Sequence, residues 1–500
     1  MHIQLARLLT LSCLCGWASL APAQELTSFK KQYEDGGIYD GTFKDGLQHG
    51  TGSYTLPNGY SYSGDWVMGE IKGTGRATYP NGSVYEGEFM AGRPNGIGKI
   101  TFLDGGTYQG SWVNGEIEGT GVATYMNGST YKGEFLNAEH HGKGILQMPD
   151  GYVYDGIWEN GVKQGTANIL YPDTSRYEGQ ITAGQRDGTG TLWLADGLVY
   201  IGTWTNGEIN GTGEIRQPNG DIYTGELRDG RRHGQGTLKY GNDDTYSGQF
   251  KDDQRDGQGA FMASNGFRYN GTWIQGVMEG AGEMIYPDGS KYVGGIRNNL
   301  PEGTGKITYP DGATYAGGWK EGLFSGQGIA QHANGLRYEG GFAQSRYNGE
   351  GRLDMPNGYR YVGQWQDGFK SGIGTATYPD GVQYQGTFFE GQRHGQGTLR
   401  APDGFVYSGQ WRQGEIFGTG QATYANGDIY SGAFRGGRRH GKGILTVADG
   451  VTFAGLWDNG ELIEPAAQSA PAQTAEPQTE ALDTPTQQTT PTATTEPAEN

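Results

Sequence analysis

An aromatic residue returns every 23 residues along most of the chain, and each return begins a short alternation of apolar and polar positions. Glycine stands two residues after this first ring, and a second aromatic or large aliphatic residue stands four residues after it. No insertion or deletion interrupts the period, which is the signature of a tandem repeat architecture. The first-ring position is held by Tyr39, Tyr62, Tyr85, Tyr108, Tyr131, Tyr154, Tyr177, Tyr200, Tyr223, Tyr246, Tyr269, Tyr292, Tyr315, Tyr338, Tyr361, Tyr384, Tyr407 and Tyr430 and, in a nineteenth unit, by Phe453.

Each repeat predicts two β-strands joined by tight turns. From Tyr39 to Phe43 the two rings and Gly41 share one face of a strand, and a similar alternation resumes over residues 50–56. Asx-Gly pairs such as Asn58-Gly59 adopt positive φ at low cost, so they predict the hairpin turn that leads to the next repeat. A second turn, around residues 46–49, is expected to close the hairpin inside the repeat. Glycines opposite the rings predict a thin layer of aromatic side chains packed on backbone.

The second ring and the turn that follows it vary together. Repeats with Trp in the second position carry an apolar turn residue, as at Ile117, Ile209 and Ile416, whereas most other repeats carry Arg or His. Two interpretations remain open: duplication of a 46-residue unit, or one edge that presents apolar and cationic turns alternately to a repetitive partner or a second copy. The basic candidate binding residues are Arg93, Arg186, Arg231, Arg232, His233, Arg393, His394, Arg438, Arg439 and His440.

The repeated unit resembles the MORN repeat (membrane occupation and recognition nexus). The segment YTGELRDGRRHGQG, residues 223–236, is similar to the family consensus except at Leu227. The resemblance extends over about nineteen units and implies an all-β fold, an elongated single-layer twisted antiparallel meander of tandem β-hairpins. It also implies self-association, as in several members of the family, and the family name points to membrane lipid.

Composition narrows the class of protein further. The 500 residues include 94 Gly but only 19 Pro and no triplet period, which excludes collagen. Rings supply much of the apolar content (32 Tyr, 17 Phe, 11 Trp), so a thick enzyme core is not expected. The formal charge of −18 opposes binding to nucleic acid, and it also weakens attraction to anionic lipid.

The two ends of the chain depart from the repeat. Residues 1–23 combine Arg7, an apolar stretch and a small-residue cleavage site, which predicts a signal peptide for export to the periplasm, outer surface or medium of a bacterium. Both cysteines lie in this segment, so no disulfide framework is expected. A leader of residues 24–38 precedes the array, predicted at 39–460. Residues 461–500 carry seven acids and no base and predict a disordered tail.

No motif for catalysis stands outside the repeat positions. The G-x-G strings are repeat glycines without a following helix, and the recurrent His, including His49, is interpreted as a turn residue rather than a metal ligand. We therefore expect a non-enzymatic protein with no cofactor and no metal. Three functions remain open: an exported scaffold that binds a protein or itself, peripheral binding to lipid through a strip of Arg-bearing turns, and glycan binding through the aromatic face.

Overall fold

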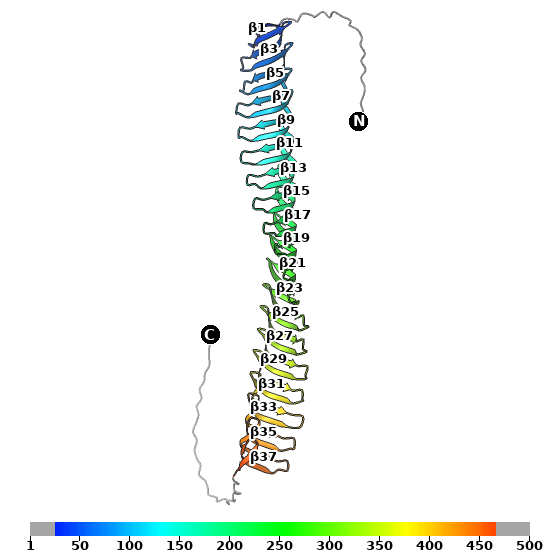
Figure 1. Cartoon of the computed structure of the whole chain (residues 1–500), viewed down its shortest axis with the longest axis vertical. Helices are drawn as coiled ribbons and strands as arrows, with labels where there is room; N and C mark the ends of the chain where they lie inside the picture. The colour runs from blue at the N-terminus through cyan, green and yellow to red at the C-terminus, as the bar shows by residue number, and fades with distance from the viewer. Residues whose placement is uncertain (1–25, 467–500) are drawn as a thin grey trace, which may run out of the picture. The chain divides into compact units, whose positions relative to one another are not determined.

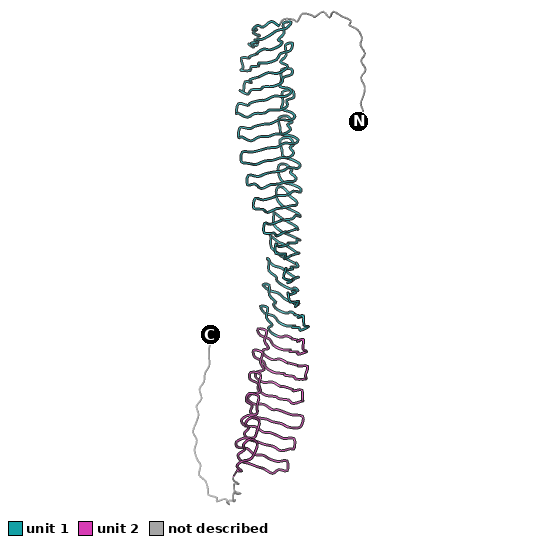
Figure 2. The backbone as a smooth tube through the Cα atoms, viewed as in Figure 1, with its two compact units in different colours: residues 1–326 teal, residues 327–500 magenta. Residues whose placement is uncertain are grey.

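The computed structural model describes residues 26–466, and within that range the protein is all-β with no helix. The predicted signal peptide and all but the first residues of the predicted tail lie outside the described residues. The chain divides into two compact units, residues 1–326 and 327–500 (Figure 2). Each unit is an antiparallel meander in which consecutive strands are joined by hairpins (Figure 1).

Unit 1 begins with the six-residue strand β1 (Thr27–Gln32) and then alternates strands of seven and nine residues. Its seven-residue strands are β2 (Ile38–Lys44), β4 (Ser61–Val67), β6 (Val84–Met90), β8 (Thr107–Val113), β10 (Thr130–Leu136), β12 (Val153–Glu159), β14 (Arg176–Thr182), β16 (Val199–Thr205), β18 (Ile222–Arg228), β20 (Thr245–Lys251), β22 (Arg268–Ile274), β24 (Lys291–Arg297) and β26 (Thr314–Lys320). Its nine-residue strands are β3 (Leu47–Thr55), β5 (Glu70–Thr78), β7 (Arg93–Thr101), β9 (Glu116–Thr124), β11 (Glu139–Gln147), β13 (Val162–Leu170), β15 (Gln185–Trp193), β17 (Glu208–Arg216), β19 (Arg231–Lys239), β21 (Gln254–Met262), β23 (Val277–Ile285) and β25 (Leu300–Thr308).

Unit 2 continues the same alternation, and the boundary between the units falls within β27 (Leu323–Gln331). Its strands are β28 (Arg337–Ala343), β29 (Arg346–Asp354), β30 (Arg360–Gln366), β31 (Phe369–Thr377), β32 (Gln383–Phe389), β33 (Gln392–Arg400), β34 (Val406–Arg412), β35 (Glu415–Thr423), β36 (Ile429–Arg435), β37 (Arg438–Thr446), β38 (Thr452–Asp458) and β39 (Glu461–Pro465). The predicted hairpin meander, with two strands in each repeat, is therefore confirmed.

The sheet reaches beyond the predicted array at both ends. Strand β1 lies in the predicted leader and pairs with β2, with Lys31 opposite Tyr39. Strand β39 lies at the start of the predicted tail and pairs with β38, with Leu462 opposite Trp457. Phe453, the first ring of the nineteenth unit, is 43 % exposed because β39 is too short to cover it.

The turn inside the repeat lies earlier than the sequence predicted. Asp45 and Gly46 both have positive φ, 51° and 80°, as a two-residue type I′ hairpin requires, and β3 begins at Leu47. The residues predicted as a turn at 47–49 are therefore strand residues that point to alternate faces. Between Gly41 and Phe43 the register shifts through a β-bulge, after which Phe43 lies opposite Gln48.

The core of each unit is a layer of rings on one face of the sheet. All eighteen first-position tyrosines are at most 2 % exposed, and the second-position residues are 2–6 % exposed. The hydroxyl of Tyr39 lies over Gly52 of the adjacent strand, where an added Cβ would come within 2.3 Å of it, and it donates a hydrogen bond to the Thr42 carbonyl. The repeat glycines are therefore needed because the tyrosine ring occupies the space of their side chains.

Candidate functional site

Within each unit the first-position tyrosines and the residues four positions after each form one buried layer, here called the ring ladder, in which the second position is aromatic except at Ile181, Leu227 and Ile296. Trp112 contacts Tyr108 of its own repeat and Tyr85 of the preceding repeat, with ring centroids 5.7 and 5.0 Å apart in edge-to-face geometry. Burial raises the pKa of the Tyr108 hydroxyl to about 12, so this side chain is uncharged at physiological pH. The face of the sheet that carries the ladder is called the ring face, and the opposite one the open face.

Indole hydrogen bonds fix the ladder to the backbone. Trp112 donates its Nε1–H to the Gly98 carbonyl at 3.3 Å, and seven other ladder tryptophans make the equivalent bond to the glycine fourteen residues earlier at 3.1–3.3 Å. The polar edge of each of these buried indoles is thereby satisfied. The rings leave no free face for stacking a sugar, so the expected glycan binding through these aromatic residues is wrong, and their role is packing.

Several predicted basic residues lie on the ladder rather than in free turns. The Arg393 guanidinium stacks 4.4 Å from the Trp411 ring and donates from Nη2 to the Gly414 carbonyl at 2.8 Å. Arg186 and Arg439 make the same pair of contacts, at 4.0 Å from Trp204 and 4.4 Å from Trp457. The Arg232 guanidinium lies 5.6 Å from the Phe250 ring and donates to the Asp253 carbonyl. The side chain nine residues after the first ring thus packs on the ladder.

Other residues occupy this ninth position in the same way. His140 stacks on Tyr131 with ring centroids 3.6 Å apart, and burial lowers the pKa of its imidazole to about 4. Ile117, Ile209 and Ile416 are half-buried there, each opposite a ladder tryptophan. The sequence analysis missed Lys163, whose amino group lies 4.9 Å from the Tyr154 ring, although the fixed spacing would have found it.

The flanking positions have different surroundings. Arg93, Arg231 and Arg438, eight residues after the first ring, are exposed at the start of their strands. His233, His394 and His440, ten residues after it, are half-buried, and His440 contacts Asp458 at 3.1 Å. The predicted basic strip therefore consists of three kinds of position: position eight is exposed to solvent, position nine packs on the ladder, and position ten is half-buried. Binding by any of these residues stays a prediction.

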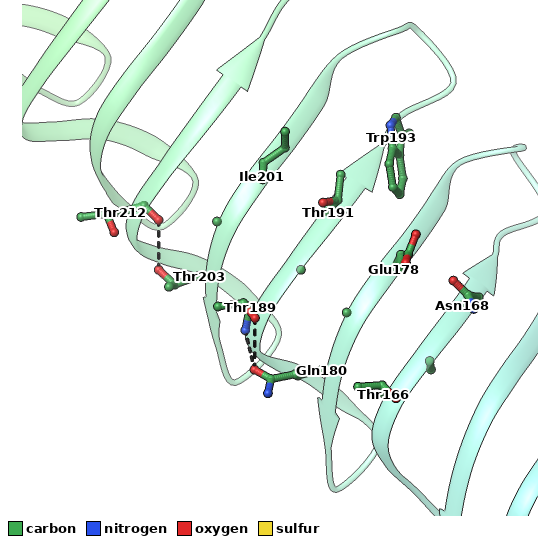
Figure 3. Close-up of a pocket in the computed structure, with 14 residues that line it drawn as sticks. Thr166, Asn168, Glu178, Gln180, Thr189, Thr191, Trp193, Ile201, Thr203 and Thr212 are labelled. Atoms are coloured by element: carbon green, nitrogen blue, oxygen red, sulfur yellow. Dashed lines mark hydrogen bonds between the residues drawn. The ribbon is translucent and has the colours of Figure 1, made fainter.

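The open face has grooves where residues vary from repeat to repeat. One groove of about 600 Å³ lies over β7 to β12, and its floor includes Ile97, Val122 and Ile145. A second groove of about 920 Å³ lies over β13 to β17 and contains Trp193 with several threonines (Figure 3). Among residues 26–466 no group of three or more acidic, His or Cys side chains is placed to hold a metal ion. The same stretch of chain has no helix of the length and apolarity that crossing a membrane requires.

Trp193 is the functional candidate that the sequence analysis missed. It stands sixteen residues after Tyr177, outside the two ring positions, whereas the other nine tryptophans of the described residues are ladder members. A tryptophan that the repeat does not require was a signal available from the sequence.

The MORN repeat family model matches eighteen consecutive segments between residues 39 and 452. These are residues 39–59, 62–84, 85–107, 108–130, 131–151, 154–176, 177–199, 200–222, 223–245, 246–268, 269–291, 292–314, 315–337, 338–358, 361–383, 384–406, 407–429 and 430–452. The expected unit at Phe453 is not among them.

The similar solved structures are distant. The TCP domain of Drosophila melanogaster SAS-4, solved in complex with a proline-rich motif of Ana2, is 15 % identical, covers 40 % of this chain and 90 % of its own, and has a TM-score of 0.20. The TCP10 domain of Danio rerio CPAP is 14 % identical, with 52 % and 95 % covered and a TM-score of 0.16. A streptogramin B lyase is 10 % identical, with 69 % and 92 % covered and a TM-score of 0.11. No curated protein sequence matches the chain.

Proposed function

The chain belongs to the MORN repeat family, and from this premise we propose that it is a non-catalytic scaffold that binds a protein partner or a second copy of itself through its open face. We further propose that it acts outside the bacterial cytoplasm, on the strength of the signal peptide that the sequence predicts in residues 1–23. The observation that carries the proposal is the apolar cluster of Ile97, Val122 and Ile145, which lies among charged residues in one groove of the open face.

The cluster has the make-up of a protein-binding surface. Ile97 and Val122 are 57 % and 41 % exposed, and Ile145 is half-buried, although every ladder residue on the other face is covered. Val122 and Ile145 flank Lys132 on adjacent strands. Exposed apolar residues grouped in this way mark interaction sites more often than isolated ones do. The ring face holds the fold together, so these side chains are free to contact a partner.

The charges around the cluster have both signs. Lys132, Glu134, Lys143 and Asp155 line the same groove, and Asp155 lies opposite Ile145. Charged residues therefore stand among the apolar ones, and Lys132 lies between Val122 and Ile145. Non-obligate protein interfaces are mixed in this way, since they are about as apolar as the rest of a protein surface. A two-fold contact brings the same patch of each copy together, and a patch with both signs can pair with itself. A surface for anionic lipid or nucleic acid would instead need an excess of Lys and Arg.

The test uses the full mature chain and two substitutions in the cluster. Ile97→Lys and Val122→Glu replace exposed side chains, so the fold is expected to remain intact. We expect the double variant to weaken self-association in light scattering, or retention of a partner protein from an envelope extract, by at least about tenfold. Met126→Lys is the matched control, because Met126 is 75 % exposed but lies outside this groove. If neither measurement distinguishes the double variant from the control, the proposal is wrong.

Peripheral lipid binding is the second candidate, favoured by the exposure of Arg93, Arg231 and Arg438. Co-sedimentation of the mature chain with phosphatidylglycerol vesicles across a salt series tests it. Charge reversal of the three arginines should release the chain if they contact the headgroups, at about 1 kcal/mol for each contact. Binding that does not depend on salt or on these arginines contradicts lipid recognition by the strip.

A further inference from the structure

The groove over β13 to β17 contains an aromatic residue that the architecture does not explain. Trp193 ends β15 on the open face, and Arg176 of β14 lies directly opposite it with its guanidinium 5.2 Å from the indole. At the same place in other repeats stand threonines such as Thr78, Thr101 and Thr308. A large indole is therefore not needed to complete the sheet. It is half-buried, whereas the ladder tryptophans are 2–6 % exposed.

Hydroxyl, amide and carboxyl groups line the groove in two rows across the strands, one next to the indole and one nearer the other end of the strands. Asn168, Glu178 and Thr191 lie opposite one another on β13, β14 and β15, next to Trp193 in the groove (Figure 3). The second row includes Gln180 and Thr189. The Gln180 Oε1 accepts a hydrogen bond from the Thr189 amide at 2.7 Å, which holds the side-chain amide in place beside the groove.

The charge of the groove excludes some ligand classes. Its lining includes Glu178 and no Lys or Arg, and Arg176 stands only beside the indole. Phosphate-bearing or anionic ligands would meet the Glu178 carboxylate, and the one cation nearby, Arg176, is engaged with the Trp193 ring. A neutral ligand with many hydroxyl groups suits the lining better, because the threonines, Asn168 and Gln180 offer both donors and acceptors.

The periodicity of the groove agrees with an extended polymer. Thr166, Thr189 and Thr212 occupy the same place in three successive repeats, and successive repeats are two strand spacings apart, about 9.6 Å. That step is similar to the length of an extended disaccharide. The groove crosses five strands, so it spans about four spacings or roughly 19 Å, long enough for several sugar rings.

We infer that this groove binds a neutral, extended oligosaccharide, with Trp193 as the stacking platform and Asn168, Glu178, Gln180 and the threonines as hydrogen-bonding groups. Pyranose rings present an apolar C–H face that packs on an indole and hydroxyl groups at their edges, which matches this arrangement. The site is separate from the cluster of Ile97 and Val122, so the proposal goes beyond protein binding and does not depend on it.

The experiment titrates the full mature chain with two β-1,4-linked tetramers, of glucose and of N-acetylglucosamine, by calorimetry. The indicated variant is Trp193→Thr, because other repeats fold with threonine at this position. The matched control is Met262→Thr, since Met262 stands at the same repeat position on β21, outside this groove. We expect at least one tetramer to bind, with about tenfold or greater weakening in Trp193→Thr and no change in Met262→Thr.

Fluorescence provides a second readout of the same site. Trp193 is the described tryptophan most open to a quencher, so a bound tetramer should protect part of the emission from acrylamide, and Trp193→Thr should abolish that protection. Binding of neither tetramer, or binding that Trp193→Thr leaves unchanged, overturns the proposal. Ile97→Lys with Val122→Glu should leave sugar binding intact, which separates this result from the test of protein binding.

Discussion

Replacing Arg439 by alanine should loosen the last strands of unit 2 far more than replacing Arg438, its neighbour in sequence. The Arg439 guanidinium stacks 4.4 Å from Trp457 and donates to the Gly460 carbonyl at 2.7 Å. A cation–π contact contributes about 0.5–2 kcal/mol, and a hydrogen bond from a charged donor about 1.5–3 kcal/mol. Since one side chain makes both contacts, we expect Arg439→Ala to lower the free energy of opening these strands by about 2–3 kcal/mol. Arg438 is exposed, and its replacement should change stability by less than about 0.5 kcal/mol.

Hydrogen exchange of the β38 amides measures this difference locally, because β38 carries Trp457 and pairs with β37. Opening free energies lower by about 2–3 kcal/mol correspond to exchange about 30- to 150-fold faster, at 1.4 kcal/mol for each factor of ten. Arg438→Ala should leave the same amides within about twofold of the unsubstituted chain. Equal acceleration in the two variants would refute the assignment of the ninth position to the ladder and restore the view of both arginines as free turn residues.

Three further predictions follow from single residues. The pKa of His140 is about 4 in the fold and 6.5 when unfolded, so lowering the pH from 6.5 to 4 should remove about 1–2 kcal/mol of stability, after allowance for its partial exposure. His140→Phe is the matching substitution, because Phe324 stacks on Tyr315 at the equivalent place. In this variant the melting temperature should fall less between pH 6.5 and pH 4 than in the unsubstituted chain, and an equal fall contradicts the prediction. Thr174 has a φ of 72°, in the left-handed region that favours glycine, so Thr174→Gly should raise the free energy of unfolding by about 1 kcal/mol. Thermal unfolding measures this change, and a lower stability of the variant would argue against backbone strain at Thr174. Gly144→Ala would place a Cβ 2.1 Å from the Tyr131 hydroxyl and should cost about 1–3 kcal/mol. Adding Tyr131→Ala removes the hydroxyl and also the ring carbons at 2.3 and 2.5 Å, so the two losses should be less than additive, whereas additive losses would exclude the contact.

Much of the fold follows from the sequence because the repeat constrains it at several positions together. Tyr39, Gly41 and Phe43 predict a strand with one ring face, and the structure buries both rings there. Asn58-Gly59 predicts a turn, and Gly59 adopts a φ of 93°. These predictions succeed because alternation and positive φ are local properties that short segments specify.

The position of the inner turn depends on pairing across strands, and the sequence did not resolve it. The predicted turn at residues 46–49 included the positions eight and nine residues after the first ring, which Arg438 and Arg439 hold in their repeat. With the turn at Asp45 and Gly46, the same residues alternate between faces, so Arg439 stacks on the ladder while Arg438 is exposed. The spacing of Arg and His alone does not distinguish these environments, because a shift of one residue moves a side chain to the other face.

The ring ladder also has a consequence for how such a chain can change in length. Within unit 1, Trp112 contacts the tyrosines of its own and the preceding repeat, and Phe135 makes equivalent contacts one repeat later. A gene duplication or deletion of one 23-residue block therefore joins surfaces that already fit, and the new junction inherits working contacts. Trp193 occurs in one repeat, so such an event can move, copy or erase this indole while the ladder contacts are kept. Duplication or deletion of whole repeats can thus change the residues on the open face during evolution, while the ladder contacts that stabilise the fold are preserved at each step.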